Sequence, residues 1–271
     1  MKLTQRNVLK DIDSIKKYFG LFDKIFIFLD FDGTLVRFRK NPYDVKLSKK
    51  AFYVLEKISK NSKIINGIVS GRKISELEFF LGDHLSKSLN LFGCHGSEIK
   101  FKNMDIKIAE EAVESIESIK FIQNIIEKEF INTHGFIFEK KENSFAVNYR
   151  NAFNSEKKKI EYLKGVFLEF EKKYPVKLLD LKKVFEIVPR NINKSFAIKA
   201  TAKKYYNILK ENSCIFLCIG DDTTDENLFM ENLDGVNIKV GVVSPNGTNA
   251  NFILNNIKEV IIFLNKISCI S

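Results

Sequence analysis

The sequence contains no apolar run that approaches the roughly 20 residues of a membrane-spanning helix. Its first 24 residues also lack the continuous apolar core of a signal peptide, and they carry acidic residues at Asp11, Asp13 and Asp23. The spacing of the apolar residues in this segment predicts an amphipathic helix instead. We therefore expect neither a membrane protein nor a secreted one.

Cysteine is scarce, with four residues in a chain of 271, and no pair has the C-x-x-C spacing. Cys214 and Cys218 fall inside an apolar run that predicts a strand. This scattered pattern favours a reduced, cytoplasmic setting.

The sequence also lacks a basic helix or a stripe of alternating basic and aromatic residues, although its net charge is +10. A positive surplus can attract anionic partners, but these lysines are dispersed and often stand beside Glu or Asn. We expect no nucleic-acid or membrane partner. With 45% hydrophobic and 29% charged residues, the composition is that of a soluble globular protein, long enough for two domains.

An apolar run over 25–29 predicts a strand that is covered on both faces. It leads directly into Asp30 and Asp32 and a turn at Gly33. Two like charges at the end of a buried strand raise each other's pKa unless a cation lies between them, so the pair suggests a divalent metal. The alternative is a solvated turn in which Asp32 caps the next helix.

Strands and helices alternate over 1–105 and again over 190–271. The expected strands are 25–29, 63–69, 89–92, 214–219 and 236–243, and the expected helices are 47–59, 74–81, 196–210, 228–233 and 258–267. This alternation predicts an α/β domain with a parallel, Rossmann-like sheet, whose ligand site lies at the carboxyl ends of the strands.

The segment 106–189 follows a different pattern, in which a helix and two strands occur twice. Helices are expected at 109–130 and 155–174, and strand pairs at 135–140 with 144–150 and at 176–181 with 184–188. This duplication predicts an inserted α+β domain with a small antiparallel sheet and helices on one face. The first domain is then discontinuous, with parts 1–105 and 190–271.

The residues at the strand ends suit the hydrolysis of a phosphate monoester, which needs a nucleophile, a proton donor and a cation. Asp30 would be the nucleophile, and Asp32 would protonate the leaving oxygen and then activate water. Lys194 would neutralise the phosphate and the attacking carboxylate. A cluster of oxygen ligands suits Mg²⁺. The candidate metal ligands are Asp30, Asp32, Asp221, Asp222 and Asp225.

Ser70-Gly71-Arg72 follows the second predicted strand. A hydroxyl and backbone N–H groups at the start of a helix could hold phosphoryl oxygens there. The alternative is that Ser70 only caps the helix.

The order and spacing of these pieces resemble the haloacid-dehalogenase (HAD) phosphatases with a C2-type cap, and among them the trehalose-6-phosphate phosphatase family. The resemblance covers 26–264. It rests on Asp30-Phe31-Asp32-Gly33-Thr34-Leu35, Ser70-Gly71-Arg72, Gly93-Cys94-His95-Gly96-Ser97-Glu98-Ile99, the Asp-Asp-x-Thr-Asp-Glu run within 220–226, and the cap segments Glu139-Lys140-Lys141, Asn148-Tyr149-Arg150 and Phe185-Glu186-Ile187-Val188-Pro189.

The resemblance implies a Mg²⁺-dependent phosphatase that hydrolyses trehalose 6-phosphate through an aspartyl phosphate. It also implies that the cap binds the sugar hydroxyls, for which paired, charge-assisted hydrogen bonds are suited. The substrate-binding residues so implied are Ser70, Gly71, Arg72, His95, Glu139, Lys141, Arg150 and Glu186. The alternative for the cap residues is that they form ion pairs on the strand surface.

Two residues depart from the family pattern: Asn148 stands where His is usual, and Ser195 where Gly is usual. Related glycosyl phosphates, such as glucosylglycerol or mannosylglycerate phosphate, therefore stay open as substrates. The functions of a phosphomutase and of a non-catalytic sugar-phosphate sensor stay open as well. The chain is too short to include a glycosyltransferase, so any trehalose-phosphate synthase would be a separate protein.

Overall fold

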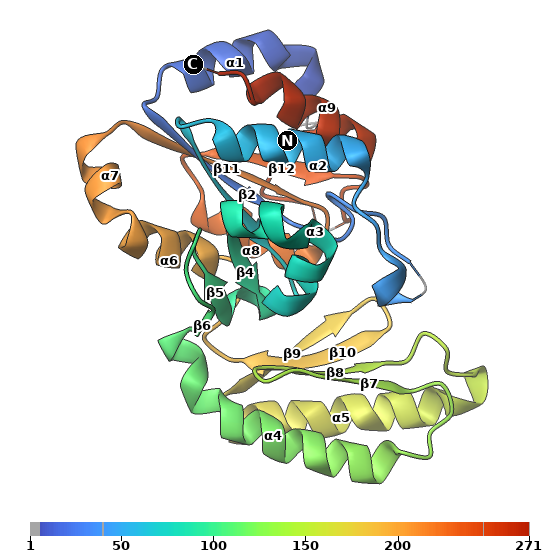
Figure 1. The fold of residues 1–271 in the computed structure, drawn as a ribbon. Helices are drawn as coiled ribbons and strands as arrows, with labels where there is room; N and C mark the ends of the chain where they lie inside the picture. The colour runs from blue at the N-terminus through green and yellow to red at the C-terminus, as the bar shows by residue number, and fades with distance from the viewer. Residues whose placement is uncertain (1–5, 40, 246, 271) are drawn as a thin grey trace. The chain divides into compact units, whose positions relative to one another are not determined.

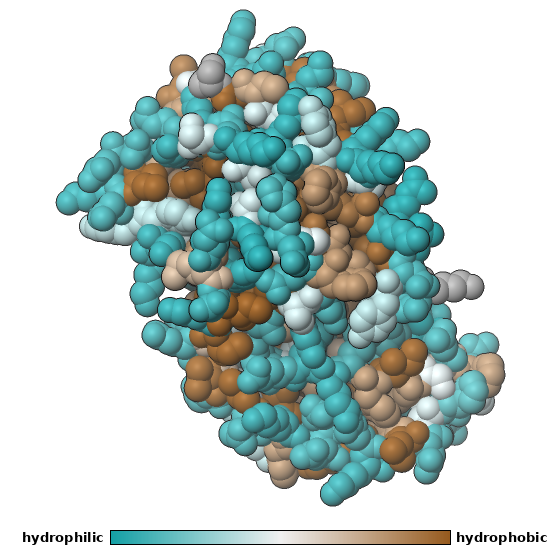
Figure 2. Space-filling model, viewed as in Figure 1, coloured by the Kyte–Doolittle hydropathy of each residue, from teal (hydrophilic) through white to brown (hydrophobic). Residues whose placement is uncertain are grey.

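The computed structural model describes residues 6–39, 41–245 and 247–270. They fall into two compact units, Met1–Ile106 with Asn193–Ser271, and Lys107–Ile192. The sequence placed the insertion at 106–189. Among the described residues, no helix is both long enough and apolar enough to cross a membrane. The face of the molecule in Figure 2 is mostly hydrophilic, with hydrophobic side chains in scattered patches.

The first unit, which we call the core, is built on a sheet in which its strands follow the order β1-β13-β12-β11-β2-β3-β4-β5 (Figure 1). In this sheet order, every neighbouring pair of strands between β1 and β4 is parallel, and β4 pairs with β5 in the antiparallel direction. Its strands are β1 (Arg6–Asn7), β2 (Lys24–Leu29), β3 (Ile64–Val69), β4 (Asn90–Gly93), β5 (Glu98–Lys100), β11 (Cys214–Gly220), β12 (Val236–Val240) and β13 (Phe252–Leu254). The short strand β6 (Lys107–Ile108) begins the second unit.

Helices cover both faces of this sheet. The α-helices of the core are α1 (Ile12–Gly20), α2 (Lys49–Lys60), α3 (Ile74–Ser88), α6 (Phe196–Lys204), α7 (Tyr206–Glu211), α8 (Glu226–Glu231) and α9 (Ile257–Ile267). Helices α1, α2, α3 and α9 bury their apolar side chains in one cluster, and α6 and α8 bury theirs in another.

Strand β2 contributes to both clusters because its side chains alternate between the faces. Ile25, Ile27 and Leu29 pack on the side of α1, α2, α3 and α9, and Phe26 and Phe28 pack on the other side. The prediction of a strand covered on both faces is confirmed, and it explains why β2 can sit in the middle of the sheet.

One helix prediction was confirmed and one was wrong in detail. The helix expected over 74–81 does end at Gly82, where φ is 73°, and a second helical stretch that the sequence did not predict follows it to Ser88 within α3. Burial of Leu85 beyond the break favours the continuation. The helix expected over 196–210 is two helices separated at Tyr205, whose ring packs 5.9 Å from that of Phe26, edge to face. The sequence also missed the short strands β1 and β13.

The second unit, the cap, has a four-stranded antiparallel sheet with the order β7-β8-β10-β9. Its strands are β7 (Ile137–Lys140), β8 (Phe145–Asn148), β9 (Val176–Leu181) and β10 (Val184–Pro189), and its helices are α4 (Glu110–Phe130) and α5 (Lys157–Lys173). Phe145, Val147, Phe185 and Ile187 alternate along their strands and pack with buried residues of α4 and α5. One face of the sheet is therefore apolar and covered by helices.

Candidate active site

Three carboxylates meet at the carboxyl ends of β2 and β11. These strands are parallel neighbours with Leu29 opposite Ile219, and the Asp30 amide donates to the Ile219 carbonyl at 2.9 Å. Asp30 and Asp221 therefore leave the sheet side by side. Asp225 lies one turn further on, and one oxygen from each of the three carboxylates lies within 4.8 Å of the others.

Lys194 joins two of these carboxylates. Its Nζ donates to Asp30 Oδ1 at 2.6 Å and to Asp225 Oδ1 at 2.8 Å, and all three side chains are buried. The other oxygen of Asp225, Oδ2, accepts from the Asp222 amide at 2.9 Å. The sequence predicted Asp225 only as a metal ligand, because nothing in the spacing indicates its contact with a lysine 31 residues away.

The cluster is electrostatically unusual because it holds several charges out of water. Burial raises the pKa of Asp30 well above its ordinary value; Lys194 opposes this, and Asp225 and Asp221 add to it. Burial and the charge of Asp225 raise the pKa of Asp221 to about 7. Burial lowers the pKa of Lys194, but Asp225 and Asp30 outweigh it and hold that pKa above the ordinary value. One ammonium faces three carboxylates, which favours binding of a cation.

The donor set fits Mg²⁺. Asp30 Oδ2 and Asp221 Oδ1 are buried and have no hydrogen-bond partner. An unpaired buried carboxylate oxygen is destabilising, and a hard divalent cation that prefers oxygen ligands would compensate for it. Asp30, Asp221 and Asp225 are the residues that could hold the ion.

Two of the five predicted ligands lie outside this group. Asp222 is exposed, and its Oδ1 accepts from the Thr223 amide at 2.7 Å, so it caps the short 3₁₀ helix Thr223–Asp225. The carboxylate of Asp32 is bound by Arg72.

Two glycines allow the carboxylates to approach the backbone. Gly33 has a φ of +88°, and a Cβ at this position would lie 2.2 Å from Asp221 Oδ2. A Cβ on Gly220 would lie 2.2 Å from Asp225 Cγ. Any side chain at either position would displace a carboxylate of the cluster.

Arg72 holds Asp32 with two hydrogen bonds, from Nε to Oδ2 at 2.5 Å and from Nη2 to Oδ1 at 2.8 Å. Its guanidinium carbon also lies 4.9 Å from the centroid of the Phe80 ring and 5.9 Å from that of Phe31. A bidentate pair stacked on aromatic rings has a fixed geometry. Asp32 therefore does not cap a helix, and that alternative was wrong.

The loops after β3 and β4 are hydrogen-bonded to each other. The His95 amide donates to the Ser70 carbonyl at 2.9 Å, and Ser70 Oγ accepts from the Arg72 amide at 3.2 Å. A Cβ on Gly71 would lie 2.8 Å from Nε2 of His95, so the imidazole packs directly against this glycine. The structure thus brings Ser70, Gly71, Arg72 and His95 together.

Helix α3 begins after Lys73, and its first amide, that of Ile74, donates to Oε2 of Glu98 at 2.7 Å. The alternative in which Ser70 caps this helix was therefore wrong. Glu98 is buried and was not predicted as a site residue. Its position directly after the Gly-Cys-His-Gly-Ser segment was the only available signal.

The predicted sugar-binding residues lie on the cap sheet, on the face opposite α4 and α5. Ala146 on β8 pairs with Glu139 on β7 and with Glu186 on β10, so both glutamates point to the same face as Ala146.

This face carries a connected polar cluster. Glu186 Oε1 accepts from Lys141 Nζ at 2.8 Å and from Ser144 Oγ at 2.7 Å. Asn148, which stands where the family usually has His, donates from Nδ2 to Glu139 Oε1 at 3.4 Å. Arg150 is exposed, and its amide donates to the side chain of Asn148. The sequence missed Ser144, whose place two residues before Ala146 was a signal that it shares this face.

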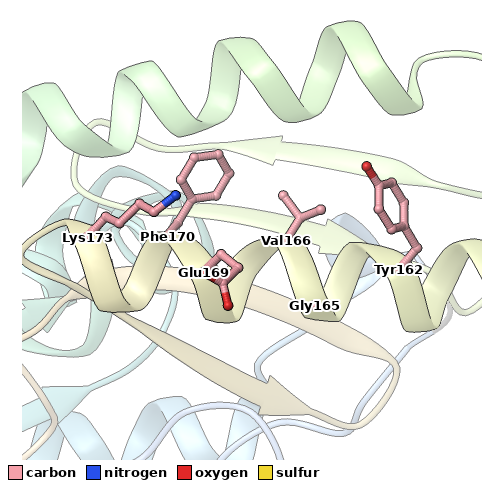
Figure 3. A pocket seen from close by; sticks show the side chains of 6 residues that line it. All are labelled: Tyr162, Gly165, Val166, Glu169, Phe170 and Lys173. Atoms are coloured by element: carbon pink, nitrogen blue, oxygen red, sulfur yellow. The ribbon is translucent and has the colours of Figure 1, made fainter.

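A pocket of about 470 Å³ lies elsewhere on the cap, along α5 (Figure 3). Its lining residues are Tyr162, Gly165, Val166, Glu169, Phe170 and Lys173. None of the predicted site residues belongs to it, and its two charged residues are a glutamate and a lysine. We assign it no part in the chemistry.

The model of the trehalose-phosphatase family matches residues 28–257 of this sequence. The chain belongs to this family. The predicted family is thereby confirmed.

Curated relatives agree. Over 249 residues, the chain is 29% identical to alpha,alpha-trehalose-phosphate synthase [UDP-forming] B of Dictyostelium discoideum, a match that covers 89% of this chain and 30% of the relative. It is 28% identical over 229 residues to a trehalose-phosphatase of Schizosaccharomyces pombe, and this match covers 79% of this chain and 24% of the relative. The chain thus spans about a quarter to a third of these relatives.

Among solved structures, the trehalose-6-phosphate phosphatase C-terminal domain of C. albicans is similar, with a TM-score of 0.84 and 21% identity. The match covers 97% of this chain and 98% of that one. The predicted fold class, an α/β protein with a Rossmann-like parallel sheet and an α+β cap, is confirmed.

Proposed function

We propose that this chain hydrolyses trehalose 6-phosphate to trehalose and phosphate, with Asp30 as the nucleophile. The observation that carries the proposal is the buried group of Asp30, Lys194, Asp221 and Asp225, in which two carboxylate oxygens lack partners. A purely structural role would leave no reason to bury three carboxylates around one lysine.

In the first step, a carboxylate oxygen of Asp30 attacks phosphorus, and the bond from phosphorus to the sugar oxygen breaks. Asp32 gives a proton to that leaving oxygen, so trehalose departs as the neutral sugar and an aspartyl phosphate remains on Asp30. Lys194 Nζ, 2.6 Å from Asp30 Oδ1, orients the nucleophile and offsets the charge of the phosphoryl group.

In the second step, the oxygen of a water molecule attacks phosphorus, and Asp32 takes a proton from that water. Phosphate leaves, and the carboxylate of Asp30 is restored. A Mg²⁺ ion held by Asp30, Asp221 and Asp225 would supply positive charge for the phosphoryl oxygens. The hydroxyl of Ser70 and the guanidinium of Arg72 would donate hydrogen bonds to those oxygens.

The cap would supply the specificity for the sugar. Glu139 and Glu186 offer carboxylate acceptors, and Lys141 and Arg150 offer donors, as vicinal hydroxyls require. Lys141 and Glu186 already pair with each other at 2.8 Å, so sugar binding would exchange one polar contact for others. We propose a cytoplasmic enzyme whose substrate is supplied by a trehalose-phosphate synthase.

A phosphate-release assay over a panel of sugar phosphates, with and without Mg²⁺, tests this proposal. The panel includes trehalose 6-phosphate, glucosylglycerol phosphate, mannosylglycerate phosphate and an aryl phosphate. We expect Mg²⁺-dependent release that is fastest from trehalose 6-phosphate. Faster release from another glycosyl phosphate would reassign the substrate, and binding without release from any of them would identify a sensor.

A further inference from the structure

Lys239 is a buried lysine that the proposed chemistry does not use. It lies on β12, where it pairs with Gly220, the residue before Asp221 on the neighbouring strand β11. It is only 3% exposed, a rare state for lysine unless the ammonium is paired. This position places it next to the acidic loop, which we define as residues 221–226.

The ammonium of Lys239 contacts the acidic loop at two points. Its Nζ donates to the Asp222 carbonyl at 2.9 Å and lies 3.6 Å from Glu226 Oε1. The other oxygen of Glu226 accepts from both the amide and the side chain of Asn249, at 2.8 and 3.2 Å. Lys239 thus connects β12, the acidic loop and the loop before β13.

These contacts bear directly on the carboxylates. The Asp222 amide donates to Asp225 Oδ2, so Asp222 is bound to Lys239 through its carbonyl and to Asp225 through its amide. Lys194 holds the other oxygen of Asp225. The orientation of Asp225, and of Asp221 next to Asp222, therefore depends on where Lys239 fixes the backbone of Asp222.

We propose that Lys239 is a positioning residue that raises the affinity of the acidic loop for a divalent cation by holding the backbone of the loop in place. The inference rests on the proposed role of Asp30, Asp221 and Asp225 in binding Mg²⁺. This ion demands near-ideal octahedral geometry, so a loop that moves by a fraction of an ångström binds it less well.

The proposal can be separated from a simple charge effect because the two predict opposite changes in cation affinity when Lys239 is removed. A positive charge near the carboxylates repels a cation, so removing it should by itself tighten cation binding. If Lys239 acts as a clamp, removing it should weaken binding instead, despite the lost repulsion. The direction of the change decides between them.

The test compares Lys239→Met with Lys199→Met as the matched control. Lys199 is also in the core and lies 3.5 Å from a glutamate, Glu231, but its side chain is 58% exposed. The probe is Mn²⁺ alone, which also prefers oxygen ligands, with the free ion counted by electron paramagnetic resonance. We expect Lys239→Met to weaken Mn²⁺ binding about tenfold or more, and Lys199→Met to leave it within about twofold of wild type.

Hydrogen exchange of the metal-free proteins gives a second readout. The amides of 222–226 should exchange faster in Lys239→Met than in wild type, and at the wild-type rate in Lys199→Met. If Lys239→Met does not fold, Lys239→Arg serves instead, because it keeps the positive charge but cannot place a compact ammonium between the Asp222 carbonyl and Glu226; since the charge is unchanged, it should weaken Mn²⁺ binding only through the lost positioning. Unchanged or tighter Mn²⁺ binding in the folded variant would overturn the proposal.

The result is independent of the proposed hydrolytic function. If wild type hydrolyses trehalose 6-phosphate but binds no Mn²⁺, the inference about Lys239 is wrong and the hydrolysis stands. If Mn²⁺ binding depends on Lys239 but no sugar phosphate is hydrolysed, the inference stands and the proposed function is wrong.

Discussion

Arg72 binds the carboxylate of Asp32 through both of its oxygens, at 2.5 and 2.8 Å. The proposed general acid is therefore held in place by a residue that is itself a candidate for binding the phosphoryl group. A phosphate dianion would compete with Asp32 for the same guanidinium. Arg72 thus connects substrate binding to the position of the acid.

Arg72→Lys should lower kcat/KM for trehalose 6-phosphate by roughly ten- to a hundredfold, since an ammonium cannot donate in the planar, two-pronged geometry. Arg37→Lys is the matched control, because Arg37 is exposed. Steady-state phosphate release measures both variants. A value for Arg72→Lys within about twofold of wild type would show that the forked contact has no part in turnover.

Glu139→Ala should lower kcat/KM for trehalose 6-phosphate far more than for a small aryl phosphate. Losing a carboxylate that accepts from sugar hydroxyls should cost about 1.5–3 kcal/mol, roughly ten- to a hundredfold. Glu186→Ala should act alike, but it also removes the buried ion pair with Lys141 at 2.8 Å and should therefore lower the melting temperature.

The ratio of the two kcat/KM values in each cap variant is the measurement, with Glu161→Ala on the exposed side of α5 as the control. Equal losses of kcat/KM on both substrates would mean that the glutamates do not contribute to recognition of the sugar. The cap residues would then be ion pairs on the strand surface.

Chelation should abolish activity. EDTA would remove the ion that Asp30, Asp221 and Asp225 are expected to hold, and added Mg²⁺ should restore turnover better than Ca²⁺, which is larger and takes looser geometry. Phosphate release in excess EDTA, followed by addition of each cation, measures this. Undiminished release in EDTA would contradict the metal assignment.

Stabilisation of the protein by Mg²⁺ should increase between about pH 5.5 and pH 8. Burial and Asp225 raise the pKa of Asp221 to about 7 in the metal-free protein, so below that pH a proton must leave before a cation binds. The raised pKa also means that this group contributes stability at low pH that is lost as pH rises through about 7.

Thermal melts with and without Mg²⁺ across this range give the measurement. The difference in melting temperature should be small at about pH 5.5 and should level off above the pKa of Asp221. In Asp221→Asn this dependence should be much weaker. A difference that is largest at the acidic end of the range would contradict the account.

The sequence predicted those features that depend on local pattern and on parallel strand order. Asp30 and Asp221 could be placed together because each follows an apolar strand, and the ends of parallel strands meet at one edge of a sheet. The two glutamates of the cap were identified as binding residues only through the family resemblance, but their shared face follows from strand pairing.

Contacts between side chains far apart in the sequence could not be predicted. The pairs of Arg72 with Asp32 and of Lys194 with Asp225 depend on how loops fold over the sheet edge. Lys239 is one of many lysines in the sequence, and its burial, which it shares with few of them, is visible only in the structure. The break at Tyr205 likewise depends on aromatic packing with the sheet rather than on helix propensity.

The central claim is that Asp30 is the nucleophile of a sugar-phosphate phosphatase, and Asp30→Asn tests it most directly. The amide keeps the shape of the side chain but loses the nucleophile and the charged metal ligand. Asp44→Asn, at an Asp in the loop that follows the same motif, is the control. With melting curves showing both variants folded, we expect phosphate release from trehalose 6-phosphate to vanish in Asp30→Asn and to stay near wild type in Asp44→Asn. Release by Asp30→Asn above about a few per cent of the wild-type rate would contradict the claim.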